Sequence, residues 1–157
     1  MTIIAGPPES TVKRLLSDAE LPASDITPEK LQTFFASESD GELEGVVGLE
    51  LYGNVGLLRS LVVPLRLRSG GRGSALVAHA EGVARARGVA ALYLLTTTAE
   101  RFFRRLGYER VAREAAPPEI QRTSEFSGIC PVSSAFMVKQ LPADLPLRRT
   151  PRKRRAA

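Results

Sequence analysis

The spacing of apolar positions divides the chain into helical and extended segments. Between residues 10 and 19, three aliphatic side chains recur at the spacing of one helix face. A second short helix is predicted from Pro22 onward, and Thr27 with Pro28 supplies a cap and a first-turn proline. The chain is therefore expected to begin with helices.

A set of extended segments follows. Strands are predicted over residues 31–37, 44–52 and 56–63. The pairs Asp40-Gly41 and Gly53-Asn54 are hairpin turn signals. They predict that each strand returns beside the one before it.

Beyond Pro64 the pattern changes to alternating helices and strands. An alanine-rich helix is predicted over residues 74–87 and ends at Gly88. Residues 89–96 form a nearly continuous apolar run, as in a central strand covered on both faces. The remaining predictions are a helix at 99–106, a strand at 108–113, a loop or short helix at 117–122 and a last strand at 133–140. This order predicts one α/β domain with a mixed sheet.

Positive charge is concentrated at the end of the chain. The net charge is +5, and residues 142–157 account for all of it with six basic side chains and one acidic side chain. The folded domain, assigned to residues 1–141, is neutral and lacks the field that attracts nucleic acid, so no specific nucleic-acid partner is predicted. The segment 142–157 is rich in Pro and Arg and is predicted to be a disordered tail rather than a binding arm.

Cysteine content and hydropathy indicate the compartment. The single cysteine, Cys130, has no internal disulfide partner, which fits a reducing environment. No apolar run approaches the length of a membrane span, and the first nine residues lack the features of a signal peptide. A cytoplasmic protein without a membrane partner is expected. No cluster of acids or histidines predicts a metal site, and a homodimer is left open.

The glycine-rich loop between residues 61 and 74 carries the strongest chemical signal. A strand leads into Arg68-Ser-Gly-Gly71-Arg-Gly73, and a helix starts directly afterwards. Free N–H groups and the positive end of a helix dipole suit a pyrophosphate, and glycines let it approach the amides. The spacing is neither that of a Walker loop nor that of the dinucleotide fingerprint. A plain tight turn is the alternative.

The loop resembles the pyrophosphate signature of the GNAT acetyltransferase superfamily, in the form Arg68-x-x-Gly71-x-Gly73. Ala99-x-x-Phe102-Phe103-x-x-x-Gly107-Tyr108 resembles the closing helix and turn of that superfamily. More narrowly, Gly48-Leu-Glu50, residues 58–63, residues 93–98 and Cys130-Pro131 resemble the group associated with arsenic-resistance operons. The resemblance spans residues 11–141.

This resemblance implies a mostly antiparallel sheet with helices on both faces, whose central strands splay near Val63 and Thr96 to admit the arm of acetyl-CoA. It also implies that N–H groups near Val62 and Val63 hold the thioester carbonyl. The residues expected to bind acetyl-CoA are Leu61, Val62, Val63, Arg68, Ser69, Gly70, Gly71, Arg72, Gly73, Ser74, Phe102 and Phe103.

The acceptor is expected to be a small amine, and Glu50 is the candidate base for its ammonium proton. The period of two places Glu50 and Tyr52 on one strand face, and a turn at residues 53–54 brings Leu57 opposite Glu50 with Arg59 one step diagonal. Glu50, Tyr52 and Arg59, with Thr96 and Thr97, are assigned to the acceptor side. An amino-acid-like substrate suits this set, with Arg59 on its acid group. A cross-strand ion pair on a solvated face is the alternative.

Two departures from the superfamily pattern are relevant to the activity. Phe103 occupies the position of a frequent tyrosine that protonates the leaving thiolate, and Thr96 that of a frequent asparagine. The general acid is therefore open, with Tyr108 or a water as substitutes. Two functions remain: acetyl transfer to a small amine, including resistance-type acetylation of an arsenical or phosphinic amino acid, and silent acyl-CoA binding as a sensor.

Overall fold

The computed structural model describes residues 2–142. A single seven-stranded sheet has the order β1-β2-β3-β4-β5-β7-β6. Its strands are β1 (Thr2–Ala5), β2 (Phe34–Ser39), β3 (Glu42–Tyr52), β4 (Val55–Val62), β5 (Ala91–Thr96), β6 (Glu109–Arg110) and β7 (Ala135–Gln140). Among these described strands, the β4–β5 pair is parallel and the other pairs are antiparallel. This confirms the predicted mixed and mostly antiparallel α/β domain.

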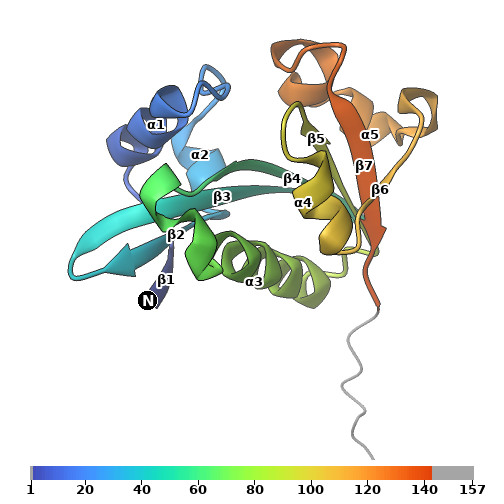
Figure 1. The fold of residues 1–157 in the computed structure, drawn as a ribbon. Coiled ribbons are helices and arrows are strands. Elements are labelled where there is room, and N and C mark those ends of the chain that lie inside the picture. The colour runs from blue at the N-terminus through green and yellow to red at the C-terminus, as the bar shows by residue number, and fades with distance from the viewer. Residues whose placement is uncertain (1, 143–157) are drawn as a thin grey trace, which may run out of the picture.

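Helices cover both faces of the sheet (Figure 1). They are α1 (Glu9–Asp18), α2 (Pro28–Leu31), α3 (Arg72–Ala86), α4 (Glu100–Arg105) and α5 (Pro118–Gln121). One core cluster places α3 beneath the sheet together with Phe103 of α4. A second cluster packs α1 on the opposite face, and a third packs Ile120 of α5 against Phe136 on that side. Within residues 2–142, no helix is both long enough and apolar enough to cross a membrane.

The β3–β4 hairpin has the register that the sequence predicts. Glu50 pairs with Leu57, and Arg59 pairs with Gly48 one step further along. Tyr52 pairs with Val55 across the two-residue turn, so Glu50, Tyr52 and Arg59 share one face of the sheet. That face is the one covered by α1 and α2.

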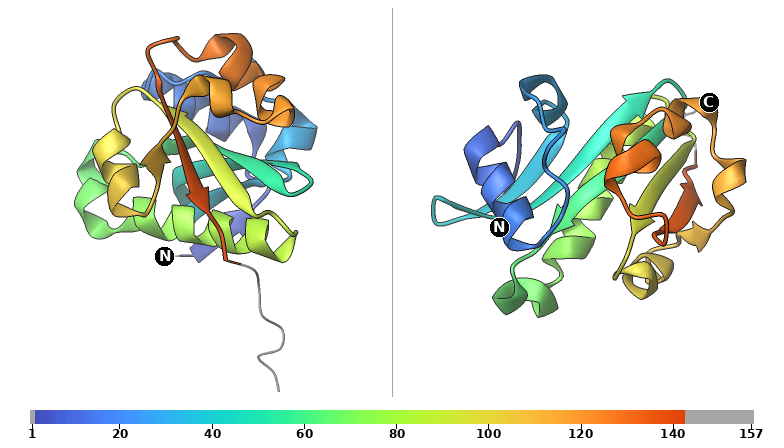
Figure 2. Two further views of the ribbon diagram at one scale, coloured as in Figure 1. Left: turned by 90° about the vertical axis from the view of Figure 1, so that its right-hand side faces the viewer. Right: turned by 90° about the horizontal axis from the view of Figure 1, so that it is seen from above.

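The sheet opens between its two central strands. β4 and β5 pair over only three positions, ending at Leu57 and Tyr93. Beyond these residues the strands diverge, and the two halves of the sheet separate like the arms of a V (Figures 1 and 2). Ser60 lies in this stretch of β4 with φ 60, and the β3–β4 register shifts beside it. Positive φ is uncommon outside glycine, so the bulge turns the edge of β4 locally.

Several element predictions were wrong in detail. The strand expected at residues 31–37 is shifted by α2, which Thr27 caps by accepting from Lys30 N–H at 3.2 Å. No helix starts at Pro22, and the first strand, β1, was not predicted. The strand expected at 108–113 shrinks to β6, and a 3₁₀-helix, Leu65–Gly70, precedes the glycine turn. Of the predicted tail, residues 143–157 lie outside the described residues.

Candidate active site

A cavity of about 1020 Å³ occupies the opening between β4 and β5. It runs from the glycine loop across the free edge of β4 to the segment that joins α1 and α2. Its lining includes Arg59, Leu61, Val62, Val63, Arg68, Gly71, Gly73, Ser74, Thr96, Thr97, Phe102 and Phe103 from the predicted set. Glu50, Tyr52, Gly70 and Arg72 are not among the lining residues, and the side chain of Ser69 is outside what the structure describes.

The glycine loop is the candidate anion site at the start of α3. Gly71 adopts φ 78, a left-handed conformation that ends the 3₁₀-helix and begins α3. The first bond of the new helix runs from Ala75 N–H to the Gly71 carbonyl at 3.1 Å. The N–H groups of Arg72, Gly73 and Ser74 precede this bond and have no partner within the helix. They are therefore candidate donors for a pyrophosphate.

Two arginines flank this loop with different roles. Arg68 donates through Nε to the Val63 carbonyl at 3.0 Å, which ties the loop to the end of β4. The Nε atom of Arg72 is buried and has no hydrogen-bond partner in residues 2–142. The Arg72 Nη2 atom lies 3.7 Å from Glu44 Oε1, and Arg72 does not line the cavity. The free N–H groups at the start of α3, where Gly73 and Ser74 line the cavity, fit the pyrophosphate of a coenzyme A thioester.

The opposite end of the cavity is built around Arg59, whose side chain is fully buried. Its Nη2 donates to Asp25 Oδ1 at 2.8 Å and lies 3.2 Å from Glu125 Oε2. Its Nη1 donates to Glu50 Oε2 at 2.8 Å and also to Asp25. The Nε atom donates to Ser60 Oγ at 3.0 Å. Because each nitrogen is paired, Arg59 has no donor left for the substrate acid group that the sequence assigned to it.

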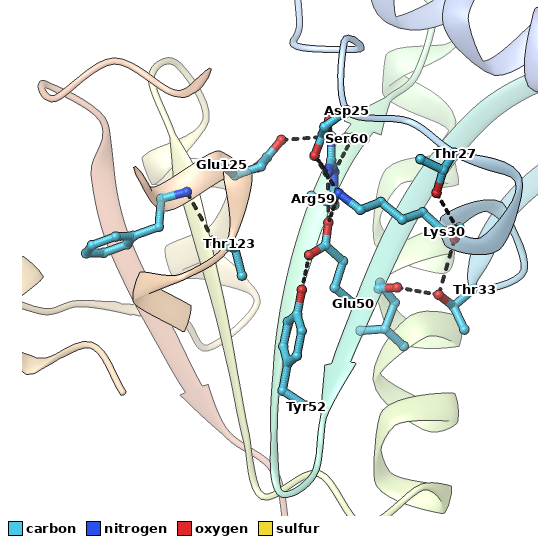
Figure 3. Close-up of polar contacts among 12 residues, drawn as sticks. Asp25, Thr27, Lys30, Thr33, Glu50, Tyr52, Arg59, Ser60, Thr123 and Glu125 are labelled. Carbon is cyan, nitrogen blue, oxygen red and sulfur yellow. Dashed lines mark hydrogen bonds and ion pairs between the residues drawn. The ribbon is translucent and has the colours of Figure 1, made fainter. Parts of the chain in front are cut away.

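Glu50 is equally occupied (Figure 3). One oxygen accepts from the Tyr52 hydroxyl and the other from Arg59, with Lys30 Nζ 3.6 Å away. The grouping of Glu50, Tyr52 and Arg59 was predicted, whereas Asp25 and Lys30 were not. The role of Glu50 as a base stays a prediction, and its carboxylate stands behind Arg59 rather than on the cavity.

The packing around the Arg59 side chain depends on a glycine in β3. Gly48 lies opposite Arg59 in the register, and the ring of Phe34 fills the space above Gly48. A Cβ at this position would approach that ring to 2.4 Å. The guanidinium carbon of Arg59 lies 5.8 Å from the centre of the same ring. Glycine in this strand therefore allows the aromatic ring to pack beside the buried cation.

Glu125 is a buried acidic residue of the cavity lining that the sequence analysis missed. It begins a five-residue π-helix, Glu125–Ile129, a rare form that occurs often at functional sites. The Thr123 hydroxyl accepts from Phe126 N–H at 3.2 Å, and the Phe126 ring packs edge-on against Phe136 of β7. The backbone N–H of Cys130 donates to the Glu125 carbonyl at 3.2 Å, which closes the last turn of the π-helix. No spacing motif marks Glu125, and only the nearby Cys130-Pro131 pair drew attention to this segment.

The charges at this end interact strongly. Burial raises the pKa of Asp25, but hydrogen bonds from Arg59 and Lys30 outweigh it and lower the value to about 2. Burial raises the pKa of Glu125, with Arg59 opposing and Asp25 and Glu50 adding to the rise. Burial and the charge of Glu125 raise the pKa of Cys130 to about 12, so Cys130 remains a thiol at neutral pH. Three carboxylates face two cations, which leaves one excess negative charge when all are ionised.

The position of Tyr108 does not suit the role of a substitute general acid. Its hydroxyl donates to Glu81 Oε2 at 2.8 Å beneath the sheet, and Tyr108 is 1% exposed. Phe103 lines the cavity and packs edge-on against Tyr108 on its inner side. Ser134 also lines the cavity, with a buried hydroxyl that has no hydrogen-bond partner among the described residues.

The pairing of Asp25 predicts a pH-dependent contribution to stability. Its carboxylate form is stabilised in the folded state, so the contribution is complete above the usual pKa of 3.8 and is lost as pH falls toward about 2. Asp25→Asn is expected to lower the free energy of unfolding at pH 7 by about 1–2 kcal/mol, allowing for partial solvent screening. Denaturant titrations between pH 2 and 7 measure the difference from the parent chain. The exposed Asp18→Asn is the control, and a difference that grows on acidification would contradict this account.

Comparison with known proteins places the fold in a family. The sequence profile of the acetyltransferase (GNAT) family matches residues 7–108. The chain is 33% identical over 95 residues to an uncharacterized N-acetyltransferase of Chlorobaculum tepidum, covering 60% of this chain and 61% of that one. The chain therefore belongs to the acetyltransferase (GNAT) family.

Solved structures share the architecture. N-acetylglutamate synthase from Neisseria gonorrhoeae, complexed with coenzyme A and L-arginine, matches with a TM-score of 0.76 at 21% identity, over 89% of this chain and 33% of that chain. A Mycobacterium tuberculosis protein in complex with CoA matches with a TM-score of 0.75 at 19% identity, over 90% of this chain and 100% of that chain. The chain spans 61% of the length of the curated relative and a third of the synthase. At these identities the solved structures establish the fold.

Proposed function

We propose that the protein transfers the acetyl group of acetyl-CoA to the amine of a small molecule. The observation that carries the proposal is one continuous cavity that joins the glycine-loop amides to an acidic end through the opening between β4 and β5. Matched structures from Neisseria gonorrhoeae and Mycobacterium tuberculosis hold coenzyme A, which supports the donor. The thioester supplies an activated acyl carbon when it is bound.

Different parts of the cavity would bind the pyrophosphate, the acyl carbonyl and the amine. The amides of Arg72, Gly73 and Ser74 would bind the pyrophosphate. The edge of β4 near Val62 and Val63 is not paired with β5, so its N–H groups are proposed to polarise the acyl carbonyl. The excess negative charge at the Arg59 end favours an ammonium group and disfavours a second anion.

The finer proposal is an amino-acid-like toxic acceptor, such as an organoarsenical or a phosphinic amino acid. It rests on the motifs that resemble the group associated with arsenic-resistance operons, among them Gly48-Leu-Glu50 and Cys130-Pro131. Since Arg59 is fully paired, it is not expected to bind an acid group of the acceptor. We expect the carboxylates around Arg59 to recognise the amine of the acceptor, and any acid group to lie toward Thr96 and Thr97. The alternative of a silent acyl-CoA sensor is favoured by one feature, Phe103 at the position of the missing tyrosine.

A thiol-release assay with a panel of amines tests the proposal. Acetyl-CoA is mixed with the full chain and with simple amines, amino acids, a phosphinic amino acid and an amino-substituted arsenical. Release that depends on an amine supports acetyl transfer, and the preferred amine defines the substrate class. Saturable binding of acetyl-CoA without release above the rate in solvent would favour the sensor.

A further inference from the structure

We infer that Glu125 is the catalytic residue that takes the ammonium proton of the acceptor, and that Glu50 positions it through Arg59. This inference rests on the proposed function. The two carboxylates differ in their access to the cavity, because Glu125 lines it and Glu50 is not among the lining residues. A base must come within hydrogen-bond reach of the proton that it removes.

The setting of Glu125 suits proton transfer. Its carboxylate pairs with Arg59 through one oxygen, Oε2, whereas both oxygens of Glu50 accept hydrogen bonds from side chains. Burial and the charges of Asp25 and Glu50 raise the pKa of Glu125, against the attraction of Arg59. A carboxylate made more basic in this way is a better proton acceptor near neutral pH.

Position relative to the acyl site gives the second argument. Arg59 and Ser60 directly precede the free edge of β4 at residues 61–63, where the acyl carbonyl is proposed to lie. Glu125 pairs with Arg59 from the segment between α5 and β7 (Figure 3), and Glu125 lines the same cavity as residues 61–63. An amine bound in this cavity could therefore contact both Glu125 and the proposed thioester position.

The reaction balances as follows. The substrate ammonium gives one proton to the Glu125 carboxylate, and the neutral amine nitrogen forms a bond to the acyl carbon of the thioester. The carbon–sulfur bond breaks with its electron pair moving to sulfur, and the thiolate takes the second proton that the nitrogen loses. Glu125 then releases its proton to solvent. The products are an N-acetyl amine, a free thiol and one proton.

Paired variants test the assignment, because Glu125→Gln and Glu50→Gln make the same chemical change on either side of Arg59. Glu125→Gln is expected to lower kcat by about 10²–10⁴-fold, with partial rescue as rising pH supplies free amine. Glu50→Gln is expected to change kcat by about tenfold or less and to keep the acid limb of the pH profile. Coenzyme A affinity and the unfolding midpoint of each variant, measured by calorimetry, show that the site is intact.

Three results overturn the inference. One is a greater loss of kcat in Glu50→Gln than in Glu125→Gln. Another is a Glu125→Gln variant whose KM rises while kcat holds, which would make Glu125 an anchor. The third is a Glu125→Gln profile whose acid limb keeps the midpoint of the parent chain, because that limb would then not report Glu125. An inactive parent chain contradicts the proposed function and the inference together, whereas an active chain with an unimpaired Glu125→Gln variant contradicts the inference alone.

Discussion

Arg59→Met is expected to lower the free energy of unfolding at pH 7 by about 3–5 kcal/mol, the cost typical of removing one partner from a buried ion pair. The side chain of Arg59 is fully buried and is shared by Asp25, Glu50 and Glu125. Without it, Lys30 is the one cation in residues 2–142 that still forms an ion pair with these carboxylates, through Asp25 and Glu50. Denaturant unfolding of both proteins measures the difference.

The pH dependence makes this prediction specific. Unpaired buried carboxylates favour the protonated form, so the deficit of the Arg59→Met variant is expected to shrink as pH falls from 7 toward 4. Arg104→Met is the matched control, because Arg104 pairs with Glu100 at 2.8 Å on the exposed surface of α4. Its loss should stay below about 1 kcal/mol. Equal losses in the two variants would show that the cluster does not stabilise the fold.

Gly73→Val is expected to weaken coenzyme A binding by about 10–100-fold, the equivalent of losing one charge-assisted hydrogen bond. A Cβ at Gly73 would lie 3.3 Å from the Phe102 ring and 3.7 Å from Val63, in the lining of the cavity. A branched side chain there would hold the pyrophosphate away from the amides that begin α3. Titration calorimetry with coenzyme A measures the change.

The control for this variant lies on the same helix. A Cβ at Gly82 meets no heavy atom within 4 Å, so Gly82→Val adds the same side chain to α3 away from the cavity. Both variants are expected to fold, and only Gly73→Val should lose affinity. Coenzyme A binding that is unchanged in a folded Gly73→Val variant would remove the glycine loop from the donor site.

The sequence predicted best those elements whose signals lie within a few consecutive residues. The two-residue turn at Gly53-Asn54 sets the register of β3 and β4, so a period of two was enough to place Glu50 opposite Leu57. The four residues of β1 carry no comparable alternation, and their pairing with β2 supplies the strand. The 3₁₀-helix before Gly71 was missed because glycine and arginine there read as a loop.

The same limit applies to the site. Glu50, Tyr52 and Arg59 were grouped because one hairpin brings them together. Asp25 reaches Arg59 from the segment between α1 and α2, and Glu125 reaches it from the opposite arm of the sheet. No periodicity relates such distant positions, since only the opening of the sheet and the packing of its covering segments place them. The sequence therefore predicted the cation and could not predict most of its partners.

Transfer of a labelled acetyl group is the most direct test of acetyl transfer to a small amine. The full chain is incubated with acetyl-CoA that carries a deuterated acetyl group and with the preferred amine of the panel. Mass spectrometry is expected to find the labelled acetyl group on the nitrogen of the amine, with one free thiol for each acetylated product. Thiol release without labelled amine, or coenzyme A binding without either product, would contradict the account.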